Sequence, residues 1–114
     1  MSENIHLVYS RRPDSITEEE YNRWYDFHLS EILVVPGFVS ARRYALSPEV
    51  VEADNPVQFT HLSLYEVEGD VPDVMAKLDA EAASGRMQLP EWFDEIHFAS
   101  WNAAPLGVKV LEEA

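Results

Sequence analysis

The sequence predicts a small α+β domain, and three observations favour that class. Four segments, near residues 5–10, 38–46, 59–67 and 95–102, alternate in the period of two that is typical of β-strands. Two others, beginning near residues 17 and 71, repeat apolar residues at three- and four-residue steps, as amphipathic helices do. The chain of 114 residues is the size of one ordinary domain, which we expect to span 1–114. The resulting order of elements is βαββαβ.

The first helix has a clear beginning and end. Thr17 and Glu20 have the spacing of a capping box, in which the hydroxyl accepts from a backbone N–H and the carboxylate reaches back to the cap. Pro36 and Gly37 should stop the helix, because proline supplies no N–H and glycine tolerates unusual backbone angles. One face of this helix carries a largely aromatic stripe, made of Tyr21, Trp24, Tyr25, His28 and Ile32.

The segments between these elements carry the expected turn residues. The segment SPEVVEADNP, residues 47–56, predicts a long connection rather than a tight hairpin. Pro72 suits the first turn of the second helix, and Gly85 suits the position just after its end. One helical turn is expected after Pro90, and the apolar run 108–111 in the tail is expected to pair with an edge or reach a partner chain.

A βαββαβ order predicts the ferredoxin-like fold, a four-stranded antiparallel sheet with two helices on one face. In the 4-1-3-2 strand order of this fold, we expect His6 and His61 on adjacent parallel strands, where they can share a face. Helices cover one side of such a sheet, yet both faces of these strands carry apolar residues. Pairing two uncovered faces would bury them, so the sequence predicts a homodimer.

Composition excludes several functions. The formal net charge of −13 disfavours nucleic acid and anionic membrane surfaces as partners. There is no cysteine, hence no disulfide, thiolate nucleophile or cysteine metal site. Four scattered histidines without an HxH or HExxH pattern predict no metal site, and no phosphate loop or dinucleotide fingerprint predicts a cofactor. With no leader sequence or long apolar run, a cytoplasmic location is expected.

The segment YNRWYDFHLSEILVVPGFVSARRY resembles the EthD-like branch of the dimeric α+β barrel superfamily. The shared pattern is a helix with an aromatic residue and a histidine, then Pro-Gly and a strand, here Trp24, His28, Pro36 and Gly37. The resemblance implies two ferredoxin-like subunits with paired sheets and a pocket between each sheet and its helices. It also implies cofactor-free lyase or isomerase chemistry on aromatic or polyketide-like molecules, as in aromatic catabolism.

Two strands resemble those of a plant polyketide cyclase from the superfamily. The segments FTHLSLYEV and IHLV match strands of that cyclase, which by comparison would place His61 and His6 in a pocket. The cyclase also uses a tyrosine and a histidine after its third strand, and VPDVMAKLDAEAASG contains neither. The same cyclisation is therefore not implied.

Histidine, with an unperturbed pKa near 6.5, suits acid–base catalysis at neutral pH, so His28, His61 and His6 are the candidate catalytic residues. The candidates for substrate binding are Trp24, Tyr25, Tyr65 and Arg43. We expect an enzyme acting on a hydrophobic or aromatic carbonyl metabolite by isomerisation, cyclisation, dehydration or decarboxylation. Two alternatives stay open: a non-catalytic binding or chaperone-like dimer, and a dimer whose histidines and tyrosines only fill its core.

Overall fold

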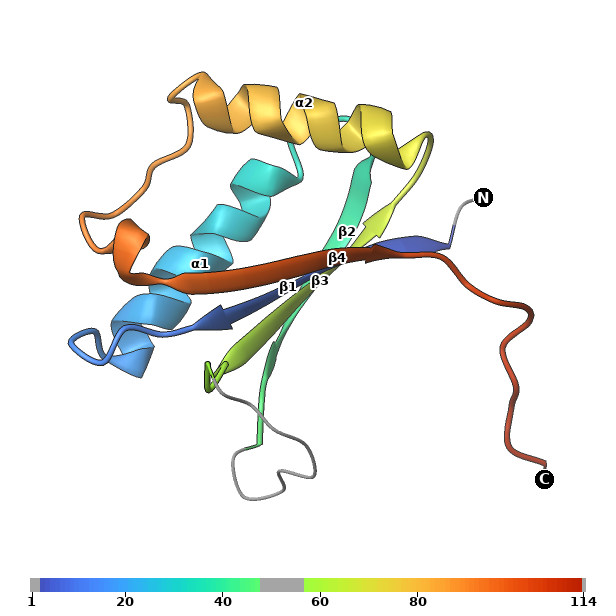
Figure 1. Cartoon of the computed structure of the whole chain (residues 1–114), viewed down its shortest axis with the longest axis horizontal. Coiled ribbons are helices and arrows are strands. Elements are labelled where there is room, and N and C mark those ends of the chain that lie inside the picture. The colour runs from blue at the N-terminus through green and yellow to red at the C-terminus, as the bar shows by residue number, and fades with distance from the viewer. Residues whose placement is uncertain (1–2, 48–56, 114) are drawn as a thin grey trace.

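The protein, in a computed structural model that describes residues 3–47 and 57–113, is a four-stranded sheet with two helices (Figure 1). The elements follow one another as β1 (Asn4–Arg11), α1 (Glu18–Ile32), β2 (Phe38–Ala45), β3 (His61–Val67), α2 (Val71–Ala83), a 3-10 turn (Phe93–Glu95) and β4 (His97–Ala103). The predicted ferredoxin-like class and element order are confirmed. The predicted connection 47–56 lies, apart from its first residue, outside the described residues.

The strands lie in the order β2-β3-β1-β4, and every neighbouring pair is antiparallel. The expectation that the first and third strands are parallel was wrong, because the crossover through α1 aligns β1 with β2 and β3 lies inverted between them. The prediction that His6 and His61 can share a face of the sheet is nevertheless confirmed. His6 lies opposite Tyr65 and Ser10 lies opposite His61, and residues directly opposite each other point to the same side.

A register shift in β2, between Phe38 and Ser40, changes which side chains face the helices. Strict alternation along the strand would group Phe38 with Ser40, Arg42 and Tyr44. In the structure the extra residue of the bulge puts Phe38 on the helix side together with Arg43, because each then pairs with a residue of β3 that is buried beneath the helices. The bulge therefore determines which arginine lies under α1.

The third strand is shorter than predicted. It begins at His61, so Phe59 lies outside it, and the Phe59 ring packs on Tyr9 with centroids 5.8 Å apart. Tyr9 lies on the side of the sheet away from the helices, because it alternates with the buried Ser10. Phe59 therefore lies on the side of the sheet without helices, which we call the open side, whereas strict alternation from His61 would place it on the helix side.

Helix α1 begins as predicted but is shorter. The Thr17 hydroxyl accepts from the Glu20 N–H at 3.2 Å, whereas the Glu20 carboxylate accepts from the Trp92 indole at 3.1 Å instead of reaching back to the cap. The helix ends at Ile32, before Pro36. Gly85 follows the end of α2 with a φ of 79°, the left-handed conformation expected at that position.

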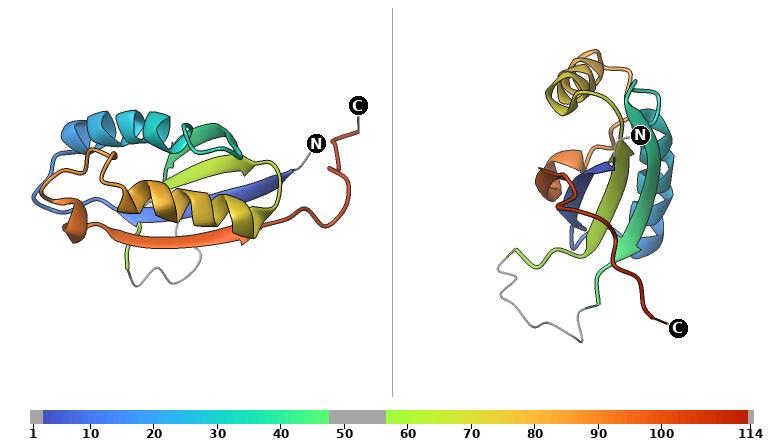
Figure 2. Two further views of the ribbon diagram at one scale, coloured as in Figure 1. Left: turned by 90° about the horizontal axis from the view of Figure 1, so that it is seen from above. Right: turned by 90° about the vertical axis from the view of Figure 1, so that its right-hand side faces the viewer.

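Both helices pack on the same face of the sheet (Figure 2). Helix α2 and the end of α1 cover one apolar cluster against β2 and β3, made of Ile32, Val35, Phe38, Tyr65, Val67 and Val74. A second cluster, of Tyr21, Tyr25 and Ile96, joins α1 to the start of β4. Within the described ranges, neither helix is long and apolar enough to cross a membrane.

Candidate active site

A group of polar side chains lies buried between α1 and the sheet, where apolar packing would be expected. We call it the inner cluster and define it as Ser10, Tyr21, Tyr25, Arg43, His61, Ser63 and Tyr65. It contains four of the seven predicted site residues. Three strands and one helix contribute to it, so its geometry depends on the whole fold.

His61 occupies one end of this cluster. The Thr60 hydroxyl donates to the Ser10 carbonyl at 3.3 Å and lies 2.7 Å from His61 Nδ1, and we therefore assign the proton of the neutral ring to Nδ1, with the hydroxyl oxygen as its acceptor. Nε2 then holds the free lone pair of the neutral ring. It lies 3.4 Å from a carboxylate oxygen of Glu18 and makes no hydrogen bond of normal geometry with any described residue.

Burial lowers the pKa of His61 below its usual value of 6.5, because a charged ring is poorly solvated there. The positive charge of Arg43 lowers it further, while Glu18 acts in the opposite direction. His61 is therefore neutral at pH 7, with Nε2 able to accept a proton. A general base needs this protonation state.

Arg43 lies over two tyrosine rings, with its guanidinium carbon 4.6 Å from the Tyr25 centroid and 5.7 Å from that of Tyr21. Its side chain is only 10% exposed, and Nη1 donates to Asp26 at 3.1 Å. Nε and Nη2 are buried and have no hydrogen-bond partner within the described residues. A buried donor left unpaired costs about 1 to 3 kcal/mol, more for a charged group.

The three tyrosines of the inner cluster remain protonated. The Tyr21 hydroxyl hydrogen-bonds to Ser10 Oγ at 2.7 Å. Burial raises the pKa of Tyr21, Tyr25 and Tyr65, since the phenolate is desolvated. Ser63 and Arg43 oppose that shift for Tyr25 and Tyr65. Protonated phenols beside a cation can donate to a developing oxyanion.

His6 lies beyond Tyr65, whose ring centroid is 5.8 Å away. Its Nδ1 donates to the Asn102 side-chain oxygen at 2.9 Å, which leaves Nε2 without a proton in the neutral ring. Burial lowers its pKa. Because the paired register separates His6 from His61 by four residues along the strands, about 13 Å, the two rings do not share one contact point.

His28 and Trp24 lie at the edge of the inner cluster. Their rings stack with centroids 4.8 Å apart, and His28 Nδ1 donates to Glu31 at 2.9 Å. Glu31 also accepts from the Gln88 backbone N–H, and the Trp24 indole donates to the Gln88 carbonyl. This side of α1 therefore holds the loop after α2, and His28 meets the inner cluster at the ring of Tyr25, with ring centroids 5.7 Å apart.

We did not predict a site role for Ser10, Tyr21, Ser63 or Asn102. Ser10 and Ser63 share the strand parity of the two histidines, so small polar residues on an otherwise apolar face were the available signal. Asn102 lies opposite His6 on β4, and nothing in the sequence fixes that register.

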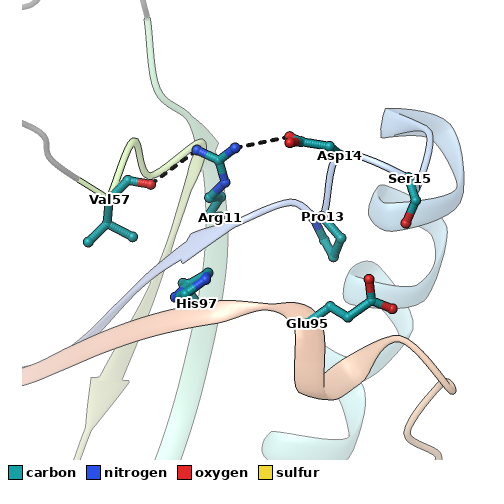
Figure 3. Close-up of a pocket in the computed structure, with 7 residues that line it drawn as sticks. All are labelled: Arg11, Pro13, Asp14, Ser15, Val57, Glu95 and His97. Atoms are coloured by element: carbon teal, nitrogen blue, oxygen red, sulfur yellow. Dashed lines mark hydrogen bonds and ion pairs between the residues drawn. The ribbon is translucent and has the colours of Figure 1, made fainter.

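A separate hollow of about 670 Å³ lies between the starts of α1 and β4. It is lined by Arg11, Pro13, Asp14, Ser15, Val57, Glu95 and His97, none of which was predicted as a site residue (Figure 3). Figure 3 shows Arg11 bridging the Val57 carbonyl and Asp14, so its guanidinium is already paired.

Within the described ranges, no group of three or more acidic or histidine side chains is placed to hold a metal ion.

The topology and the inner cluster define the class: a ferredoxin-like α+β protein with a buried histidine–arginine–tyrosine group. Solved structures with this fold include HapK from Hahella chejuensis (TM-score 0.63, 13% identity, 96% of this chain and 99% of that one). At3g17210 from Arabidopsis thaliana has a TM-score of 0.62 and 13% identity, and the match covers 94% of this chain and 99% of that one. Hydroxynitrile lyase from Passiflora edulis has a TM-score of 0.60 and 13% identity, and the match covers 94% of this chain and 96% of that one. At such identities the likeness shows the fold alone. No protein-family profile matches the sequence, and no curated protein matches it.

Proposed function

We propose that the protein is a small cofactor-independent enzyme of the EthD-like type, a lyase or isomerase acting on a hydrophobic or aromatic carbonyl metabolite in the cytoplasm. One observation carries the proposal. Arg43 Nε and Arg43 Nη2 are buried without hydrogen-bond partners among the described residues, and His61 Nε2 is buried 3.4 Å from a carboxylate oxygen of Glu18. Buried groups are nearly always paired, and exceptions concentrate where a protein binds or reacts.

These atoms supply complementary chemistry. Neutral His61 offers a lone pair that removes a proton from the carbon beside a carbonyl group. The electrons of that C–H bond form an enolate, whose oxygen accepts from Arg43 and from the phenols of Tyr25 and Tyr65. The imidazolium then returns the proton to another carbon, which isomerises the substrate, or the enolate attacks a second carbonyl carbon to close a ring and the imidazolium protonates the alkoxide that forms.

A substrate reaches these atoms by displacing Arg43. The guanidinium covers Tyr25, and its ion-pair partner Asp26 is 68% exposed. A shift of Arg43 toward Asp26 therefore keeps its charge paired, opens the space above the tyrosines and leaves Nε and Nη2 facing the oxygen of the substrate. Trp24 borders that space through its contact with Tyr25, at 5.2 Å between centroids.

His6 and His28 have secondary parts in this proposal. His6 extends the site toward Asn102 and suits a substrate long enough to pass Tyr65. His28 positions α1 and the loop at Gln88 through Glu31 rather than meeting the reacting atoms.

We further propose a homodimer in which the sheet faces without helices pair. That face carries Trp101, which is 57% exposed, and Tyr44, which is 42% exposed, beside half-buried leucines of β1 and β3. Contiguous exposed apolar surface of this kind is typical of interaction sites. A second copy supplies an identical apolar surface, and self-complementary interfaces are the commonest in homo-oligomers.

The substrate proposal is tested by binding. A panel of aromatic ketones and aldehydes is titrated into ¹⁵N-labelled protein while the Arg43 Nε–H signal is followed. We expect at least one compound to shift that signal and Arg43→Gln to weaken its binding about 10- to 150-fold, since hydrogen bonds to charged groups contribute about 1.5 to 3 kcal/mol.

Arg86→Gln is the matched control, because Arg86 is exposed and pairs with Glu81 away from the inner cluster. A compound that binds wild type and Arg43→Gln equally well would place the binding site elsewhere. If compounds bind and none is converted, the non-catalytic binding dimer replaces the enzyme.

A further inference from the structure

Arg43 leaves one complete edge of its guanidinium unpaired. Nη1 donates to Asp26 at 3.1 Å, whereas Nε and Nη2 have no hydrogen-bond partner among the described residues. In an arginine side chain the N–H groups of Nε and Nη2 point the same way along one edge, and two parallel donors match two oxygen atoms of one planar group. Both nitrogens are buried, so bulk solvent does not reach them. We call this pair of donors the free edge of Arg43.

Aromatic rings and one ion pair confine the free edge. The guanidinium carbon of Arg43 lies 4.6 Å from the Tyr25 centroid and 5.7 Å from that of Tyr21, and both phenol rings are buried. The shift toward Asp26 that admits a substrate keeps this ion pair and leaves the free edge turned to the same space. A group confined in this way loses little conformational freedom when it binds a ligand, which favours affinity.

A second cation lies beside the inner cluster. Arg12 is half-buried, its Nη1 donates to the Ile16 carbonyl, and it forms no ion pair with any described residue. Its positive charge acts on the cluster directly, because it lowers the pKa of both His61 and Tyr21. Two guanidinium groups therefore face the space in which the proposed chemistry takes place.

The negative charges near these two arginines lie at the rim. The side chain of Asp26 is 68% exposed and that of Glu18 is 60% exposed, so water screens both carboxylates. The buried side of the cluster thus carries an excess of positive charge, although the whole chain has a net charge of −13. A ligand that fits this space should be an anion, and the free edge requires that it present two adjacent oxygens.

We propose that the substrate is an aromatic 2-oxo acid, whose carbonyl oxygen and one carboxylate oxygen both accept from the free edge of Arg43. This inference rests on the proposed function, in which the carbonyl oxygen already accepts from Arg43. In a planar 2-oxo acid these two oxygens lie side by side, and the negative charge of the carboxylate is balanced by the guanidinium. His61 takes a proton from the carbon on the other side of the carbonyl group. The electrons of that C–H bond form the enolate, whose oxygen stays on Arg43 while the carboxylate is unchanged.

The test compares two probes that differ in charge and keep the same oxygens. Phenylpyruvate and its methyl ester are titrated into the protein by isothermal calorimetry. Wild type is expected to bind phenylpyruvate at least about tenfold more tightly, because hydrogen bonds from a cation to an anion are stronger than those to a neutral carbonyl group. Arg43→Gln should abolish this preference for the acid over the ester.

Arg42→Gln is the matched control. Arg42 is the neighbour of Arg43 on β2 but is exposed on the open side, opposite Leu64, so its replacement should leave the preference intact. The comparison of the two probes on wild type needs no substitution, and it therefore stands even if Arg43→Gln unfolds.

The outcomes distinguish this inference from the proposed function. Equal affinity of wild type for acid and ester, a preference that persists in Arg43→Gln, or no binding of either probe would overturn the 2-oxo acid. In the first two cases the proposed enzyme stands if a neutral ketone still exchanges its protons in a reaction that needs His61. If phenylpyruvate binds with the expected preference but its protons beside the carbonyl group exchange no faster than in buffer, the anion site stands and the proposed enzyme fails.

Discussion

Replacing His61 with glutamine is expected to lower the rate of proton transfer by about 100- to 10,000-fold, the usual contribution of a general base. Glutamine keeps a polar group beside Thr60 but has no lone pair of suitable basicity to take the place of Nε2. The rate is measured as the exchange of substrate protons for deuterium next to the carbonyl group, using a compound found to bind. Binding should change little, because His61 removes a proton without anchoring the substrate.

His97→Gln is the matched control for this experiment. His97 is exposed at the start of β4, far from the helix side of β3, and its replacement should leave exchange unchanged. Equal exchange rates for wild type and His61→Gln would remove His61 from the chemistry. A loss of exchange in His28→Gln but not in His61→Gln would assign the base to His28 instead.

Gly37→Ala is expected to destabilise the fold by about 2 to 4 kcal/mol, combining overpacking with backbone strain. Gly37 has a φ of 105°, and a methyl group there would lie 2.4 Å from Val74 Cγ2 and 3.2 Å from the Glu68 carbonyl. Val74 is itself buried in the cluster beneath α2, so it has little room to move. Urea unfolding followed by tryptophan fluorescence measures the change.

Gly85→Ala separates the cost of backbone strain at a positive φ from the cost of a steric clash with Val74. Gly85 also has a positive φ, of 79°, but no atom lies within 4 Å of the position of an added methyl group. Its replacement should therefore cost only about 1 kcal/mol. Equal losses of stability in the two variants would mean that the close packing of Gly37 on Val74 is not important.

Much of the fold follows from local signals in the sequence. Thr17 begins α1, Gly85 ends α2 and alternating strands carry the rest, because capping and strand periodicity depend on near neighbours. The bulge near Phe38 depends on pairing with β3, which is not a local property. Local patterns therefore could not choose between Arg42 and Arg43 as the arginine beneath α1.

The candidate site was predictable in residue type more than in arrangement. Helical spacing places Tyr25 and His28 on one stripe, but the stripe is wide enough for Tyr25 to be buried in the inner cluster while His28 binds Glu31 at its edge. The four-residue offset between His6 and His61 follows from strand register, which the sequence does not reveal. Long-range pairing thus decided which predicted residues meet.

The central claim, that His61 is a neutral base with a free Nε2, is tested most directly by NMR titration of the histidine rings, with His61→Gln identifying the signals. Because its pKa is lowered, His61 should be uncharged at pH 7 and take up a proton only as the pH falls below 6.5. Above that pH its neutral ring should carry the proton on Nδ1, toward Thr60. A His61 ring that is charged at pH 7, or protonated on Nε2, would contradict the account.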